Sequence, residues 1–397
     1  MKKNPVIYIH HERALGGAPL SLLYLLRQLD RSLYEPQVVC LREGPAAELY
    51  RKEGLPVRVI PGPDLSHTEL VWFRWWQWPR LAWRLLASVS LYWRLRRHFA
   101  GMSGPREQVI VHLNSSTLAV AAMAAKAAGL KVVWHIREPL AAGYAGFRRR
   151  VLRRAVEWYS DAVVAISNHD ASRLGERLQR KVTVVYNFVD FKQFDARLPH
   201  GGVRRELRIP PDAPVVLFLG GSSRVKGSEV LLRAAEFILT RVRTAHLIIA
   251  GESDPDFNLR AGSGALESLR PKIHVLGPRL DVPSLLADSN VLVFPSITPH
   301  FARPVIEAAA MARPVVASDI DGVRELVARN ETGVLAAPGD FKDLADKVID
   351  LLQDPPRAFR LGQQGLAMAR ERFDAGRNAA ATFVLYAKLL SGPGGEG

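Results

Sequence analysis

Cysteine is nearly absent from this 397-residue sequence, in which Cys40 is the single one. One cysteine cannot form an intrachain disulfide, so we expect a reducing compartment. The sequence also has no uninterrupted apolar run of about 18 residues, the length that a membrane-spanning helix needs. Near the N-terminus, Pro, His and Glu interrupt the stretch MKKNPVIYIHHERALGG, which therefore predicts a first strand and not a signal peptide.

Acidic residues are fewer than basic ones, 39 against 54, which gives a formal net charge of +15. This excess permits nucleic acid, anionic lipid or phosphorylated substrates as partners, and does not choose among them. The contents of 48% hydrophobic and 23% charged residues are those of a soluble globular protein. A chain of this length is too long for one ordinary core, so we expect about two domains.

Short apolar, β-branched runs alternate with helical patterns along most of the chain. Their continuous apolarity is typical of parallel strands that are covered on both faces, and the alternation predicts doubly wound α/β sheets. The predicted strands are 5–10, 36–41, 56–60, 108–114, 131–136, 161–167, 181–187, 214–221, 245–251, 272–277, 291–296 and 314–318. Helical patterns between them include 18–29, 116–129, 228–242 and 343–353.

The alternation pauses at LPHGGVRRELRIPPDAP, which is rich in proline and glycine and has no sustained periodicity. We therefore expect two Rossmann-like domains, over residues 1–197 and 215–375, joined by a linker over 198–214. Residues 376–397 are expected to form a C-terminal helix and tail that pack back on the N-terminal domain. Ligands of such sheets bind outside the carboxyl ends of the strands, so the loops after strands are the candidate sites.

Two of these loops have the composition of anion sites. LFLGGSSRVKGSEVLL places a Gly-Ser loop and Lys226 between a strand and a helix N-terminus, where backbone N–H groups and a cation suit phosphate. The order Lys-Gly-Ser excludes a Walker A motif, and a glycine turn with a solvated lysine is the alternative. HHERALGGAPLSLL offers a second turn, in which Gly16 and Gly17 would let backbone approach a ligand closely.

Several segments together resemble the GT-B glycosyltransferases of family 4. They are GGAPLSLLYLL, AISNHDASRL, YNFVDFKQF, GGSSRVKG and FARPVIEAAAMARPVVASDIDGVREL, in that order along nearly the whole chain. The resemblance implies two Rossmann-like domains facing a cleft. It further implies retaining transfer of a sugar from a nucleoside diphosphate donor, bound by the C-terminal domain, to a hydroxyl presented by the N-terminal domain. YNFVDFKQF departs from the family pattern at Phe188, where glycine is usual.

Glu307 is a carboxylate inside the run PVIEAAAMA, which otherwise indicates a buried helix. The resemblance implies that this carboxylate binds the ribose hydroxyls of the donor, a role that a helix N-terminus favours. The structural alternative is a helix cap. Arg303, Pro304 and Val305, just before it, are assigned to the same donor site. Arg303 could add a phosphate contact there, or it could be a surface residue. The family's other glutamate, which faces the donor sugar, is replaced by Pro299.

The diphosphate clamp is a second role that the resemblance implies. Lys226 matches the family's lysine, whereas the usual arginine position is taken by Gly221, with Arg224 as a displaced substitute. Cations here would offset the charge that grows on the diphosphate as the sugar leaves. His135, at the end of the strand in VVWHIREPL, matches a family histidine near the donor sugar, and could hydrogen-bond a sugar hydroxyl or assist proton transfer.

No metal or other cofactor is expected. Asp254-Pro255-Asp256 and Asp319-Ile320-Asp321 both match the three-residue pattern that binds metal in glycosyltransferases of the GT-A fold, and we interpret both as turn aspartates. No Gly-x-Ser-x-Gly elbow occurs, so covalent hydrolase chemistry has no support.

A segment rich in tryptophan and arginine, residues 65–99, has the composition of an interfacial membrane segment. Its docking residues are predicted to include Trp72, Arg74, Trp75 and Trp76, with FRRRVLRR as a second basic cluster. The alternative is a helix that packs its tryptophans against the sheet. Nucleic acid is not expected, because no known nucleic-acid module is apparent. The expected location is cytoplasmic, peripheral on the inner face of the cell membrane.

The sequence therefore predicts a retaining glycosyltransferase that uses a nucleoside diphosphate sugar and a glycan or lipid-linked acceptor. A nucleotide-sugar epimerase of the same fold is a rival, although its acid–base carboxylates cannot be identified. A catalytically silent membrane-associated assembly protein is another rival, for which Pro299 is the main argument.

Overall fold

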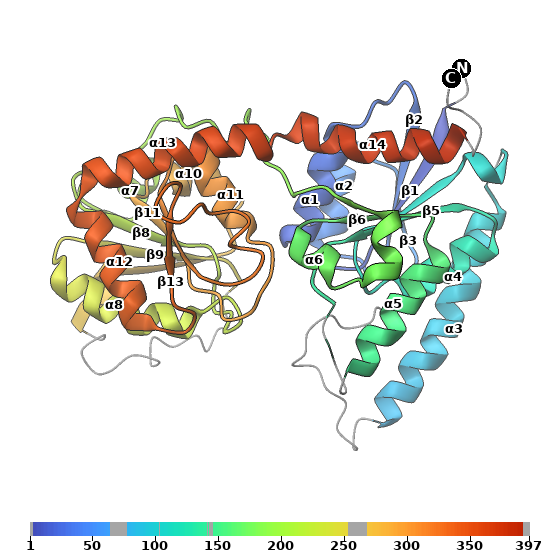
Figure 1. The fold of residues 1–397 in the computed structure, drawn as a ribbon, viewed down its shortest axis with the longest axis horizontal. Helices are drawn as coiled ribbons and strands as arrows, with labels where there is room; N and C mark the ends of the chain where they lie inside the picture. The colour runs from blue at the N-terminus through green and yellow to red at the C-terminus, as the bar shows by residue number, and fades with distance from the viewer. Residues whose placement is uncertain are drawn as a thin grey trace. The chain divides into compact units, whose positions relative to one another are not determined.

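The computed structural model describes residues 3–63, 78–102, 104–140, 142, 146–252 and 268–391. The chain forms two compact units, and each is built around its own parallel sheet (Figure 1). The N-terminal unit comprises Met1–Asn187 with Ala375–Gly397, and the C-terminal unit comprises Phe188–Asp374.

The sheet of the N-terminal unit has the strand order β3-β2-β1-β4-β5-β6-β7, with every neighbouring pair parallel. The order reverses between β1 and β4, which makes this the switch point where ligands of doubly wound sheets bind. The strands are β1 Asn4–His10, β2 Tyr34–Cys40, β3 Val57–Val59, β4 Ile110–Leu113, β5 Lys131–Ile136, β6 Ala162–Ala165 and β7 Val182–Val184.

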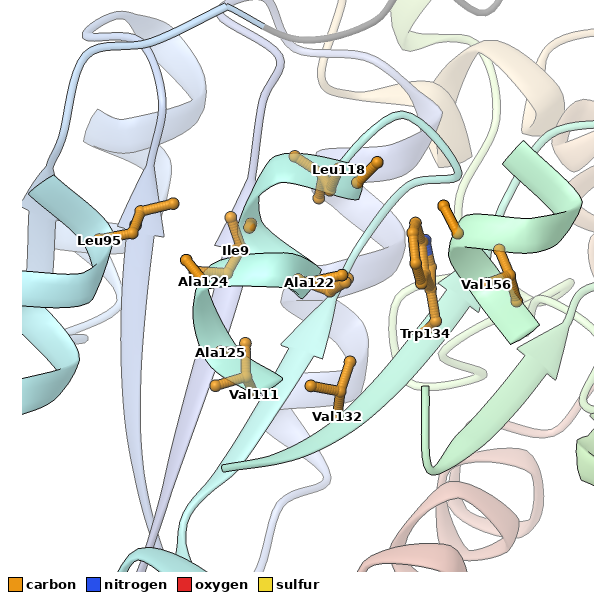
Figure 2. Close-up of a cluster of buried hydrophobic side chains, with 14 of the residues drawn as sticks. Ile9, Leu95, Val111, Leu118, Ala122, Ala124, Ala125, Val132, Trp134 and Val156 are labelled. Atoms are coloured by element: carbon orange, nitrogen blue, oxygen red, sulfur yellow. The ribbon is translucent and has the colours of Figure 1, made fainter. Parts of the chain in front are cut away.

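Helices cover this sheet and bury a core of aliphatic side chains. Figure 2 shows Ile9, Val111 and Val132 of the sheet beside Ala122 and Ala125 of α4. Small side chains on α4 let its backbone approach the sheet closely, while α3 and α5 both pack against α4. The helices are α1 Gly17–Arg27, α2 Pro45–Lys52, α3 Trp78–Ala100, α4 Ala119–Ala127, α5 Phe147–Tyr159, α6 Asn168–Ser172 and α14 Ala375–Ser391.

The sheet of the C-terminal unit repeats the pattern, with the parallel order β10-β9-β8-β11-β12-β13 and its switch point between β8 and β11. The strands are β8 Val215–Phe218, β9 His246–Ala250, β10 Ile273–Gly277, β11 Val291–Phe294, β12 Val315–Ser318 and β13 Val334–Ala336. The helices are α7 Gly202–Glu206, α8 Ser228–Arg241, α10 Val282–Ala287, α11 Arg303–Ala310, α12 Phe341–Gln353 and α13 Pro355–Arg372.

These two sheets confirm the predicted fold class of two Rossmann-like domains. Each predicted apolar run overlaps a strand of the structure: β1 and β2 begin before their runs, and most of the others are shorter than predicted. The edge strand β13 was not predicted; its sequence VLA is a short apolar run that periodicity alone does not assign to a strand.

The boundary between the units differs from the expected linker. Residues 198–214 lie inside the C-terminal unit, whose Asp288 carboxylate accepts hydrogen bonds from the N–H groups of Val203 and Arg204 at 2.7 and 3.1 Å. The side chains of Val203 and Ile209 are buried. Proline and glycine therefore mark a loss of periodicity in this segment and not a loss of packing.

The C-terminal helix α14 belongs to the N-terminal unit, where it contacts α1 and buries Tyr386 completely. The expected end of the C-terminal domain, at residue 375, lies next to the structural boundary after Asp374. Among the described residues, no helix combines the length and the hydropathy that crossing a bilayer requires.

Candidate functional site

In the C-terminal unit, the loop between β8 and α8 lies at the switch point and depends on two glycines. Gly221 and Gly227 have φ values of 57° and 86°, in the left-handed region that favours glycine. A Cβ on Gly221 would lie 2.0 Å from the carbonyl oxygen of Glu252, and one on Gly227 would lie 1.9 Å from that of Pro295. Both glycines are thus required by close backbone approach, whether or not a ligand is bound.

The same loop is joined to the loop that follows β11. The carbonyl of Val225 accepts hydrogen bonds from the Ser296 hydroxyl at 2.9 Å and from the Ile297 N–H at 3.1 Å. These bonds bring the exposed Lys226 toward His300. Burial lowers the pKa of His300, the carbonyl of Thr298 opposes this effect, and the charge of Lys226 adds to the lowering. The lysine is therefore at the carboxyl edge of the sheet, as the sequence predicts.

The side chain of Arg224 points toward α8. Its Nε lies 2.7 Å from Oε1 of Glu229 on α8, and its side chain is 80% exposed. An exposed pair of this kind contributes little to stability and holds the guanidinium over the helix surface. The role of Arg224 as a second phosphate ligand stays a prediction, and its guanidinium would have to leave Glu229 to fill it.

Glu307 lies in the second turn of α11, so it is not the helix cap. Its carboxylate is 6% exposed and accepts a 2.6 Å hydrogen bond from Nε of Arg303, one turn earlier. Burial raises the pKa of Glu307, and the Arg303 charge and hydrogen bond oppose that rise. The sequence treated Arg303 as a phosphate ligand or a surface residue, whereas the structure buries it against the predicted ribose-binding carboxylate.

The other predicted donor residues lie around the start of α11. Pro304 stands in its first turn, where a missing N–H costs nothing. Val305 is buried, and its N–H donates to the carbonyl of Ala302 at 3.0 Å. Pro299, which replaces the family's first glutamate, is exposed in the loop that precedes this helix.

In the N-terminal unit, a polar cluster occupies the carboxyl ends of β1, β4 and β5. Asn114 lies 3.2 Å from Nδ1 of His10 and accepts a 2.5 Å hydrogen bond from Nε of Arg137. Arg137 also donates to Asn187 at 2.7 Å. Burial is the main cause that holds the pKa of His10 well below its usual range. The sequence reading missed His10, Asn114 and Arg137, although the first two end a predicted strand and the third directly follows one.

His135 joins this cluster from β5 and is held by a chain of buried hydrogen bonds. Its Nδ1 lies 3.1 Å from Nε2 of His112, whose Nδ1 lies 2.6 Å from the hydroxyl of Tyr386. The hydroxyls of Tyr386 and Tyr8 are 3.3 Å apart. Burial, and next the charge of Arg137, hold the pKa of both histidines well below the usual range, so both are neutral near pH 7.

This chain of hydrogen bonds determines which tautomer of neutral His135 is present. A neutral imidazole has one N–H and one acceptor nitrogen, so the direction of the Tyr386–His112 bond sets the direction of the next bond. If Tyr386 donates to His112, His135 carries its proton on Nε2; if the bonds reverse, Nε2 is an acceptor. Nε2 of His135 is buried and has no hydrogen-bond partner among the described residues. A buried nitrogen in this state requires an explanation, and a bound ligand would provide one.

Gly16 and Gly17 lie at the N-terminus of α1, after β1. Gly16 is extended, and a Cβ on Gly17 would meet nothing within 4 Å. Neither position therefore requires glycine for the fold, in contrast to Gly221 and Gly227. An open approach to a helix N-terminus agrees with the predicted ligand contact.

The two Asp-x-Asp segments and the predicted membrane-docking residues are the remaining sequence predictions. Asp319 and Asp321 pair with Arg324 at 2.6 and 3.1 Å, and Asp319 also pairs with Arg329, so arginines occupy these carboxylates. Residues 254–256 lie outside the described residues, as do Trp72, Arg74, Trp75 and Trp76. The expectation that no metal is required stays a prediction.

Comparison with known families decides what kind of protein carries these two clusters. The profile described as Glycosyltransferase Family 4 matches residues 15–193, and the profile described as Glycosyl transferases group 1 matches residues 213–354. The chain belongs to the group 1 glycosyltransferases. The two matched ranges contain both clusters of this group 1 protein, with the exception of Tyr8, His10 and Tyr386.

Curated relatives support the same family. D-inositol 3-phosphate glycosyltransferase 2 of Catenulispora acidiphila is 32% identical over 254 residues, which are 58% of this chain and 57% of that protein. Alpha-D-kanosaminyltransferase of Streptomyces kanamyceticus is 28% identical over 185 residues, 46% of this chain and 47% of that protein. The chain thus spans about half the length of the curated relatives that it matches.

Solved structures share the fold over nearly the whole chain. Anabaena Alr3699/HepE in complex with UDP-glucose has a TM-score of 0.75 at 20% identity, covering 96% of this chain and 99% of that one. WaaG, a glycosyltransferase involved in lipopolysaccharide biosynthesis, has a TM-score of 0.70 at 14% identity, covering 95% and 99%. This likeness establishes the GT-B fold of the group 1 protein.

Proposed function

We propose that this protein transfers a sugar, with retention of anomeric configuration, from a nucleoside diphosphate to a hydroxyl of a glycan or lipid-linked acceptor. The observation that carries the proposal is the switch point of the C-terminal sheet. There, a glycine-dependent loop with Lys226 is hydrogen-bonded to the loop that leads into α11 and Glu307. A cation and backbone amides suit a diphosphate, and a buried carboxylate suits vicinal hydroxyls.

Three residues would have separate roles in donor binding and catalysis. Lys226 would stabilise the charge that develops on the diphosphate, and Glu307 would bind the ribose. His135 would hydrogen-bond a sugar hydroxyl or take part in proton transfer. Alr3699/HepE, which has the same fold, binds UDP-glucose, and this supports the class of donor. Among the described residues there is no cluster of metal-ligating side chains.

We also propose that the protein works at the inner face of a membrane. On α3, Trp83, Leu86 and Trp93 are 66%, 72% and 64% exposed, so these tryptophans are not core residues. On α5, Phe147, Val151 and Trp158 are exposed at spacings of 4 and 7 residues, which puts them on one stripe among arginines. Exposed aromatic side chains beside basic ones are typical of surfaces that dock on anionic lipid.

Following candidate donors by NMR tests the enzymatic proposal. Purified protein is incubated with UDP-, GDP- and ADP-glucose, with and without a lipid extract, and the anomeric proton is monitored. We expect loss of one donor, faster with extract, and a product whose anomeric configuration is that of the donor. A new nucleotide sugar formed without acceptor would identify an epimerase. Intact donors under all conditions would support the silent assembly protein.

A further inference from the structure

A basic pocket in the N-terminal unit lies outside the two polar clusters described above. Its volume is about 710 Å³, and its wall includes the side chains of Arg13, Arg42, Arg84 and Arg94. Arg13 follows β1, and Arg42 follows β2, whereas Arg84 and Arg94 belong to α3. The pocket therefore opens at the carboxyl edge of the sheet, the edge that also carries His10 and His135.

The described lining of this pocket is predominantly cationic. Among its described lining residues, Glu43 is the one carboxylate, and both of its oxygens accept hydrogen bonds from Arg51, at 2.6 and 2.9 Å. These bonds hold the pKa of Glu43 below its usual value. The described lining therefore has four guanidinium groups and one carboxylate. Guanidinium groups gathered around one cavity give it a positive potential, which favours an anion.

The pocket is bordered by apolar surface on the same helix. Trp83 and Ala87 of α3 line the wall, together with Leu41 and prolines 61 and 63. On the same helix, Leu86 and Trp93 are exposed. The site thus combines cations, whose guanidinium planes bind phosphate in a bidentate manner, with a surface for hydrocarbon.

We infer that this pocket binds the phosphate or diphosphate group of an amphiphilic acceptor, with the lipid chain lying along α3. The inference rests on the proposed function and names the chemical class of its acceptor. A hydroxyl on the polar part of such an acceptor would be presented at the sheet edge that carries His135, while the chain stays at the membrane surface.

Farnesyl diphosphate is a suitable probe, since it has a diphosphate and an isoprenoid chain. Binding is measured by calorimetry on the full chain with UDP in excess, so that the donor site is occupied. Inorganic diphosphate and farnesol are titrated in parallel to separate the contributions of anion and chain. We expect farnesyl diphosphate to bind at least tenfold more tightly than either of them.

The variant Arg42→Gln/Arg94→Gln removes two charges from the pocket, and we expect it to weaken farnesyl diphosphate binding about tenfold to a hundredfold. Arg97→Gln is the matched control, because Arg97 is exposed on the same helix and does not line the pocket. The control should change affinity less than twofold. UDP affinity should be the same in all three proteins.

Three results would overturn the inference. Equal affinity in wild type and the double variant would mean that the pocket does not hold the anion. Equal affinity for inorganic diphosphate and farnesyl diphosphate would indicate a small-anion site only. Loss of binding to phosphatidylglycerol vesicles in the double variant, with no farnesyl diphosphate binding in wild type, would assign the pocket to membrane headgroups. Failure of the proposed function is distinguishable, since it would appear as absent UDP binding or donor turnover while farnesyl diphosphate still binds.

Discussion

Tyr386 comes from the last helix of the chain and His135 from the fifth strand, yet only His112 separates them in the N-terminal unit. Residues so distant in sequence cannot be paired from spacing. The sequence reading singled out His135 by its position at a strand end, and could not predict what fixes its ring. Buried polar side chains that find partners across the core become visible only when the fold is known.

The variant Tyr386→Phe removes the hydroxyl at the end of this chain and keeps the ring. We expect the populations of protonated Nδ1 and Nε2 in His112 and His135 to shift, as measured by ¹⁵N NMR of labelled histidine. Catalytic turnover should fall more than donor affinity, because His135 would be set for only part of the time in its working form.

Tyr50→Phe is the control for that variant. Tyr50 is equally buried and loses a comparable hydrogen bond, to the carbonyl of Pro19 at 3.2 Å, but has no part in the histidine chain. If both variants leave the histidine spectrum unchanged, Tyr386 only fills space in the core.

Glu307 has two partners in this account, Arg303 within the fold and the ribose of the donor. Glu307→Gln should weaken nucleoside diphosphate binding by about 1.5–3 kcal/mol, because an amide is a poorer acceptor for two hydroxyls than a carboxylate. It should also lower the melting temperature, because it removes the carboxylate charge that pairs with the buried Arg303.

A double variant separates these two effects. In Arg303→Gln/Glu307→Gln no buried charge is left over, so the melting temperature should recover relative to Glu307→Gln, while nucleotide affinity should stay low. Recovery of both quantities together would mean that Glu307 acts only through the fold.

At the scale of elements, the strands and the order of the loops follow from local sequence. Each buried strand is a short, continuously apolar run, such as VVLF in β8, that can be recognised within a few residues. The direction of Arg224 could not be predicted in this way. It depends on Glu229, in the first turn of the following helix, which pairs with the guanidinium at 2.7 Å.

The loop between β8 and α8 can be tested with a matched pair of variants. Lys226→Ala should reduce turnover by about a hundredfold to a thousandfold, with a smaller effect on nucleoside binding, because charge builds on the diphosphate mainly in the transition state. Arg224→Ala, which removes a cation from the same loop, should change turnover less than threefold. Steady-state kinetics with the active donor checks both values. If Arg224→Ala instead reduced turnover more than Lys226→Ala, Arg224 and not Lys226 would be the main diphosphate ligand.

At the scale of the whole molecule, the division into units shows the limit of reading a linker from proline and glycine. The chain crosses between units after Asn187 and again after Asp374, and neither place is marked by a run of these residues. The first crossing lies in the family-like segment YNFVDFKQF, where Phe188 and Phe194 are both buried. Packing of these side chains, and not backbone composition, sets the boundary.

Membrane attachment is also a property of the whole molecule, tested by sedimentation with phosphatidylglycerol vesicles. Trp83→Ser/Trp93→Ser/Trp158→Ser should release most of the protein with an unchanged melting curve, because all three side chains are exposed. Salt should weaken the attachment of wild type, since part of it is electrostatic. Phe359→Ser is the control, because Phe359 is 68% exposed in the C-terminal unit. Wild-type protein that stays in the supernatant would contradict the membrane proposal.

The central claim is that the switch point of the C-terminal sheet binds a nucleoside diphosphate. Calorimetric titration of wild-type protein with UDP, GDP and ADP, and with the three monophosphates, tests it most directly. We expect one diphosphate to bind, at least tenfold more tightly than its monophosphate, because the second phosphate would reach Lys226 and the loop amides. If no diphosphate binds, or if the matching monophosphate binds equally well, the loop between β8 and α8 is not a diphosphate site and the claim is wrong.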